Sequence, residues 1–179
     1  YRAGQLDISN SWVNWSSGYR LPTEAEWEKA ARGGASGHRF PWSDADTIDW
    51  SRANYNSFWL GGVPCHSYDV NSTNGYNPAG RSSEYPYTTP VGLFAANGYG
   101  LYDMAGNVWE WCWDWYNSTW YGNTPATVDD TRGPVSGSSR LLRGGDWISS
   151  ADSARCAGRN YNSPLCADHY FGFRCVRGL

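Results

Sequence analysis

Alternating tryptophans form the most regular pattern of hydrophobic and polar positions in this chain. Between residues 109 and 115 they alternate with Glu110, Cys112 and Asp114. Side chains along a strand point to opposite faces in turn, so the pattern predicts a β-strand with four tryptophans on one face. The simplest interpretation is a strand of the core.

A short helix is predicted near the other end of the chain. Thr23 is a good N-cap, and Glu26 three residues later completes a capping box. Gly33 and Gly34 supply a C-terminal stop, which places the helix at residues 24–32. We interpret its charged residues as a solvated face.

The rest of the chain lacks lasting periodicity. Residues 35–87 are rich in Gly, Pro, Asn, Ser and Tyr, and predict a long excursion packed by its own aromatic side chains. A second turn-rich stretch, residues 117–139, leads to a predicted strand at residues 141–143. With 179 residues, 17% aromatic and 17% charged, the chain predicts one domain of short strands and long ordered loops.

Charge and hydropathy exclude some function classes. A net charge of −3 offers no basic stripe for phosphate groups, so we expect no nucleic-acid partner. No apolar stretch approaches the length of a membrane span, so none is expected in this chain. The five cysteines are odd in number and show no metal-binding spacing.

Four stretches resemble a known family, and they occur in that family's order. The stretches are residues 21–34 with Phe40-Pro41-Trp42, then Thr89-Pro90-Val91-Gly92, then Gly98 to Tyr116, then Leu142-Arg143-Gly144-Gly145-Asp146-Trp147 with the closing Gly172-Phe173-Arg174. Together they are similar to the sulfatase-modifying-factor, or formylglycine-generating-enzyme, family. The resemblance implies an α+β fold of C-type-lectin-like, formylglycine-generating-enzyme-like type. It covers 1–179 as one domain, and members normally carry more sequence before the helix, so we expect a natural protein longer at its N-terminus.

The enzymes of this family oxidise a sulfatase cysteine with oxygen, using two active-site cysteines that bind copper. The corresponding residues 144–155 contain no cysteine, and Ser149 aligns with the first of the pair. Cu(I) needs soft thiolate ligands, so we expect no copper and no oxidase. A second, iron-dependent branch needs a histidine cluster, whereas His38, His66 and His169 are scattered along the chain.

Two further expectations come from the resemblance alone. Cys156 and Cys175 match positions that the enzymes use for structural disulfides, and Ala31 occupies one partner position.

The family also holds a structural calcium, and its ligands correspond to four residues of the tryptophan motif here. The first and last of the four would bind through side-chain oxygens and the middle two through backbone carbonyls. These are Asp103, Gly106, Val108 and Glu110. Carboxylates and carbonyls in one tight loop suit a hard cation. In the alternative, Glu110 pairs with a buried arginine and Asp103 caps a turn. A second family calcium site would involve Asn54 and stays open.

The last thirty-odd residues alternate between a fixed frame and irregular positions. The frame comprises Gly144, Gly145, Trp147, Ala151, Ala154, Arg155, Cys156, Ala157, Arg159, Pro164, Ala167, Gly172, Phe173 and Arg174. Sixteen other positions lie between them, and every one can be reached from an Asn codon by changing only its adenines. We predict ligand contacts at fourteen, namely Ile148, Ser149, Ser150, Asp152, Ser153, Gly158, Asn160, Tyr161, Asn162, Leu165, Cys166, Asp168, His169 and Tyr170. The other two are Ser163 and Phe171.

This arrangement resembles the variable proteins of diversity-generating retroelements, whose C-terminal repeat is rewritten at template adenines. The resemblance implies a non-catalytic receptor-type protein with a variable ligand-binding segment at residues 144–174, displayed on a cell or virion surface. A protein ligand is expected first, with Tyr161, His169 and Tyr170 as main contacts and Asp152 and Asp168 tuning charge. A carbohydrate held through calcium ranks lower. The alternatives are a catalytically inactive paralogue of the family or an unrecognised oxidoreductase, since ordinary loops also favour Ser, Asn, Asp, Gly and Tyr.

Overall fold

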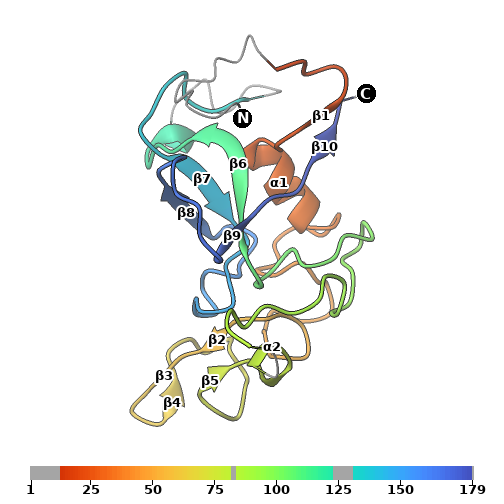
Figure 1. Cartoon of the computed structure of the whole chain (residues 1–179). Helices are drawn as coiled ribbons and strands as arrows, with labels where there is room; N and C mark the ends of the chain where they lie inside the picture. Colours follow the sequence, from red (N-terminus) through yellow and green to blue (C-terminus); the bar gives the residue numbers. More distant parts are fainter. Residues whose placement is uncertain (1–12, 82–83, 123–130, 179) are drawn as a thin grey trace.

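A computed structural model describes residues 13–81, 84–122 and 131–178 of the chain. Short elements are joined by long loops (Figure 1). The helices are α1 (Glu24–Ala31), α2 (Pro78–Arg81) and the 3₁₀ turn η2 (Trp120–Gly122). The strands are β1 (Tyr19–Arg20), β2 (Asn56–Ser57), β3 (Trp59–Leu60), β4 (Val63–Pro64), β5 (Gly75–Tyr76), β6 (Trp109–Trp115), β7 (Arg140–Arg143), β8 (Arg159–Asn162), β9 (Phe171–Gly172) and β10 (Val176–Arg177).

A four-stranded sheet in the order β8-β7-β6-β9 organises the C-terminal half. β7 runs antiparallel to both β6 and β8, while β9 runs parallel to β6 at the other edge. Helix α1 packs against β6 and β7, and Trp27 of this helix joins Cys112, Leu141 and Cys156 in one buried cluster. The sheet edge that carries β8 is therefore anchored through β7 to the helix.

The predicted tryptophan strand is confirmed as β6. Both of its faces are covered, because Glu110, Cys112 and Asp114 are all buried, as are three of the four tryptophans. Only Trp111 is half-buried, and its ring lies 5.3 Å from that of Phe171. The Arg140 guanidinium covers the Trp115 ring from 3.6 Å. Alternation in the sequence thus marks a strand between two packed layers.

The predicted helix and its capping box are confirmed in α1. The Glu26 amide donates to the Thr23 hydroxyl at 3.2 Å, and the Thr23 amide donates to the Glu26 carboxylate at 2.8 Å. The interpretation of its charges as a solvated face was wrong. Glu24 is fully buried, because it pairs with Arg143 and Arg159 from the sheet.

Residues 35–87 pack as expected around their own aromatic side chains. Phe40 stacks on Trp42 with centroids 5.2 Å apart and meets Tyr68 edge-on. Two small antiparallel pairs, β2 with β5 and β3 with β4, lie in this lower part of the molecule with α2 (Figure 1). Within the described residues no helix is long and apolar enough to cross a membrane.

Candidate functional site

Six of the fourteen frame positions of the C-terminal segment are buried, whereas Ala157, Ala167 and Phe173 are exposed. Trp147, Ala151, Ala154 and Cys156 are each at most 1% exposed. The loop that carries them turns back on itself at Gly145, whose φ is 79° and where a Cβ would lie 3.0 Å from the Ser153 carbonyl carbon. An L side chain there would be strained, so the turn depends on glycine.

Arg155 of the frame and Arg143 of β7 bind carbonyls of the loop after Trp147. Arg155 donates from Nε to the Asp152 carbonyl at 2.7 Å, and Arg143 donates from Nη2 to the Cys156 carbonyl at 2.6 Å. Charge-assisted hydrogen bonds of this kind are stronger than neutral ones. They hold the loop backbone without using any of the irregular side chains.

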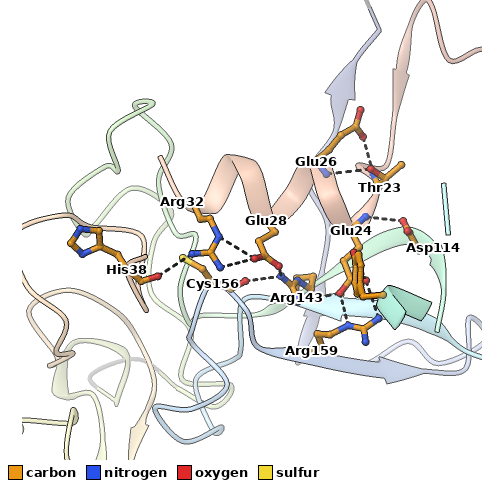
Figure 2. A network of polar contacts seen from close by, with 11 residues as sticks. Thr23, Glu24, Glu26, Glu28, Arg32, His38, Asp114, Arg143, Cys156 and Arg159 are labelled. Carbon is orange, nitrogen blue, oxygen red and sulfur yellow. Dashed lines mark hydrogen bonds and ion pairs between the residues drawn. The ribbon is translucent and has the colours of Figure 1, made fainter. Parts of the chain in front are cut away.

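A chain of alternating charges connects α1 to β7 and β8 (Figure 2). Its order is Arg32, Glu28, Arg143, Glu24 and Arg159, and the shortest contact of each adjacent pair lies between 2.6 and 3.1 Å. Arg143 is completely buried with two carboxylate partners, which is the arrangement that a buried charge requires. The network fixes the first residue of β8 against the helix.

Asp114 of β6 lies behind this network. Its Oδ2 accepts the Glu24 amide at 2.7 Å (Figure 2). Burial, helped by the neighbouring Glu24 charge and opposed by that hydrogen bond, raises the pKa of Asp114 to about 7.

The irregular positions fall into three groups, and the first surrounds Trp147. The His169 ring lies 3.9 Å from the Tyr170 ring by centroid, and both lie near Trp147. His169 Nδ1 is 2.6 Å from the Asp168 carboxylate, and Nε2 is 2.5 Å from the Tyr85 hydroxyl, which is 3.3 Å from the Tyr170 hydroxyl. Tyr85 therefore connects His169 to Tyr170, and His169 in turn contacts Asp168.

The second group is the turn after Trp147. Ile148 is 39% exposed and Ser149, Ser150, Asp152 and Ser153 are half-buried. The Ser150 hydroxyl donates to the Asp152 carboxylate at 2.6 Å. That carboxylate also lies 3.4 Å from His66 Nε2.

The third group lies on β8 and in the loop after it. Asn160 and Tyr161 are exposed on this edge strand, Asn162 is half-buried, and the Tyr161 ring stacks on Tyr116 at 3.9 Å. Leu165 and Cys166 are exposed in the next loop. Gly158 differs from the other thirteen, because it is buried and a Cβ there would lie 2.6 Å from the Ser153 carbonyl oxygen.

Comparison with known proteins places the chain in a family. The model of the sulfatase-modifying factor enzyme 1-like domain matches residues 8–179. The chain belongs to the sulfatase-modifying-factor family. Its α+β, C-type-lectin-like fold of the formylglycine-generating-enzyme type is thereby confirmed.

Relatives of this sulfatase-modifying-factor domain include proteins named as formylglycine-generating enzymes and as protein kinases. The formylglycine-generating enzyme of Thermomonospora curvata is 41% identical over 171 residues, which cover 93% of this chain and 51% of that protein. The serine/threonine-protein kinase pkn1 of Chlamydia caviae is also 41% identical, over 94% of this chain and 22% of its own length. The chain thus spans about half of the enzyme and about a fifth of the kinase.

Solved structures extend the comparison. Treponema denticola variable protein 1 superposes with a TM-score of 0.67 at 33% identity, over 97% of this chain and 54% of that one. PvdO from Pseudomonas aeruginosa gives a TM-score of 0.64 at 28% identity, over 91% and 54%. The resemblance to a variable protein that the frame suggested is therefore matched in three dimensions.

The four residues expected to bind calcium lie before and within β6. Asp103 Oδ1 is buried and accepts no hydrogen bond from the described residues, while Oδ2 accepts the Gly92 amide at 2.7 Å. Both Glu110 oxygens are bound by Arg174 at 2.5 Å, and Trp27 Nε1 donates to one of them at 2.7 Å. The unpartnered Oδ1 of Asp103 is the kind of ligand that a hard cation prefers, whereas Glu110 shows the arginine pairing of the alternative.

The cysteines provide no thiolate pair at the position used by the family enzymes. All five are unpaired, and Cys112 and Cys156 are buried. Burial raises the pKa of the Cys156 thiol to about 11, so it stays protonated at neutral pH. In the parts of the chain that the structure describes, no three or more His, Cys, Asp or Glu side chains gather as a metal site.

Sequence reasoning missed Tyr85. This residue lies outside the C-terminal segment, in a stretch that departs from the family pattern, and it is 57% exposed. Its hydroxyl meets both His169 and Tyr170, which are 84 and 85 positions away. No local signal marks a contact at that separation.

Proposed function

We propose that this domain is a non-catalytic, receptor-type protein that binds a protein ligand through the variable side chains of residues 144–174. The observation that carries the proposal is the division of the segment by burial. Six of the fourteen frame residues are buried, among them Trp147, Ala151, Ala154 and Cys156, whereas only one of the fourteen proposed contact positions, Gly158, is buried. Such a surface can change without changing the core.

The chemistry of the surface supports a protein ligand. Tyr161 is 50% exposed, and the group of Tyr85, His169 and Tyr170 adds aromatic area with hydrogen-bonding ends. Tyr supplies large contact area at low cost in conformational entropy, and Ser and Asn adapt their hydrogen bonds. The likeness to a protein named variable protein 1 supports the same conclusion.

Absence of the oxidase is part of the proposal. Relatives that are 41% identical are named formylglycine-generating enzymes, but the loop of residues 144–155 here has no cysteine. Incubating the domain with Cu(I), oxygen and a sulfatase-derived cysteine peptide should leave the peptide thiol unchanged. Oxygen-dependent loss of that thiol would establish an enzyme and refute the proposal.

The decisive test of diversification is genetic. Sequencing the DNA around this gene should reveal a second copy of the segment encoding Gly144 to Arg174, differing at adenines of the sixteen positions and lying beside a reverse transcriptase. If the surrounding DNA holds no such copy, the remaining non-enzymatic alternative is a catalytically inactive paralogue of the family.

We also propose a structural calcium held by the Asp103 and Glu110 carboxylates and the Gly106 and Val108 carbonyls. The buried, unpartnered oxygen of Asp103 supports it. Bound there, the ion would fix the loop that leads into β6. Equilibrium dialysis of calcium against the domain and its Asp103→Asn variant tests this, and equal uptake by both would refute it.

A further inference from the structure

A cleft lies between α1 and the chain that enters β8. Its volume is about 680 Å³, and it is lined by α1, the following turn, Tyr99, Tyr121 and the chain that enters β8. That volume lies within the range of small-molecule sites, which is roughly 300 to 1,000 Å³.

Positive charge dominates this cleft. Lys29, Arg32 and Arg159 line it together with a single carboxylate, that of Glu28. Figure 2 shows that Glu28 is shared between Arg32 and the buried Arg143. Lys29 is exposed and is the only lysine of the chain. Arg159 is paired with the buried Glu24, so Lys29 is the cation lining this cleft that contacts no carboxylate of the described residues.

The end of α1 does not cancel this positive charge. A helix C-terminus carries partial negative charge on its free carbonyls. Here the Asn97 amide donates to the carbonyls of Ala30 and Ala31 at 2.7 and 3.1 Å. Because these two carbonyls already accept hydrogen bonds, they compete less for the Lys29 ammonium.

Two aromatic rings flank the cations. Tyr99 lies over Gly34, where a Cβ would come 3.2 Å from its ring, and remains 54% exposed. Tyr121 is 44% exposed, and the Arg159 guanidinium lies 5.2 Å from its ring centroid. Flat apolar walls beside an exposed cation suit a planar organic anion, whose ring packs on tyrosine while its acid group meets the Lys29 ammonium.

We infer that this cleft is a fixed binding site for an aromatic carboxylate, distinct from the variable surface. Lys29 supplies the exposed charge and the tyrosines supply the apolar contact. None of the fourteen variable positions supplies a side chain to it. The inference therefore stands or falls separately from the proposed receptor function.

The single lysine allows a site-specific test. Reductive methylation with ¹³C-formaldehyde labels only Lys29 and the terminal amine, and keeps the positive charge. Benzoate should shift the Lys29 methyl resonance, with a dissociation constant of about 1 mM for a ligand of this size. Benzamide, which has the same shape without the charge, should shift it at least about fivefold less at equal concentration.

Variants separate the site from general attraction of anions. By ligand-observed NMR, Lys29→Gln should weaken benzoate binding about fivefold, as expected for one exposed charge. Arg81→Gln removes an exposed cation from α2, which does not line the cleft, and should leave binding unchanged. His169→Ser should also leave it unchanged.

Three results would overturn the inference. One is an unshifted Lys29 resonance at about 20 mM benzoate, far above the expected dissociation constant. Another is equal weakening by Lys29→Gln and Arg81→Gln. The third is equal binding of benzamide and benzoate. Thermal unfolding of each variant checks that its fold is intact.

Discussion

Replacing Glu24 by glutamine tests whether the charge network holds the variable segment to the helix. Glu24 is fully buried, and its carboxylate contacts Arg143 at 3.1 Å and Arg159 at 2.6 Å. Removing one partner of a buried ion pair costs about 3–5 kcal/mol, since the other charge is left uncompensated. Arg143 keeps Glu28 at 2.6 Å, and the Arg159 side chain is 23% exposed, so we expect the lower end, about 3 kcal/mol.

Urea unfolding followed by tryptophan fluorescence measures this loss. In a parallel thermal unfolding experiment, a loss of about 3 kcal/mol corresponds to a fall in Tm of roughly 6–12 °C for a chain of this size. Asp44→Asn is the matched control, because it breaks the exposed pair with Arg52 and should leave the unfolding midpoint unchanged. A Glu24→Gln variant within about 1 kcal/mol of the parent would refute the view that Arg143 depends on this carboxylate.

Other predictions address pH, the frame and the metal. The folded-state pKa of Asp114 is raised to about 7 from 3.8, so the folded state binds more protons in that interval. Stability should therefore fall as pH rises from about 4 to 7, and Asp114→Asn should remove this dependence in urea titrations at several pH values. Trp147→Ala should cost about 3–5 kcal/mol and Tyr161→Ser less than about 1 kcal/mol by thermal unfolding; equal losses would contradict the division into frame and surface. Calcium should raise the Tm of the parent and not of Asp103→Asn, and Arg174→Gln should strengthen calcium binding because it frees the Glu110 carboxylate; a weaker site in Arg174→Gln would contradict that competition.

Local features of the fold were predictable from the sequence, whereas long-range pairing was not. The cap of α1 depends on Thr23 and Glu26, three positions apart, and the sequence contains everything it needs. The burial of Glu24 depends on Arg143 and Arg159, which lie 119 and 135 positions away. A glutamate on a short helix gives no sign of such partners, and the expectation of a solvated face was therefore wrong.

The candidate site shows the same limit. Its frame was recognisable because the family motif fixes the order of Gly, Trp, Ala and Arg residues. The residues around the frame could not be recognised in this way, because Tyr85 and His66 contact the variable side chains from residues 35–87, where the sequence has no periodicity. Gly158 fits the variable pattern as well as any other residue of the fourteen. Its burial against Ser153 depends on the folded loop and could not be seen in the sequence.

The arrangement of arginines would allow so irregular a chain to carry the proposed variable surface. Arg143, Arg155, Arg159 and Arg174 bind carbonyls or carboxylates, and each belongs to the frame or its adjoining strand. Loop backbone positions are thus set by charge-assisted bonds that the variable side chains do not make. Substitution at an exposed variable position then removes surface contacts and leaves the frame intact, which is the condition for altering specificity at little cost in stability. Gly158 is the exception, since any side chain there must displace the Ser153 backbone, and it should tolerate the least variation of the fourteen.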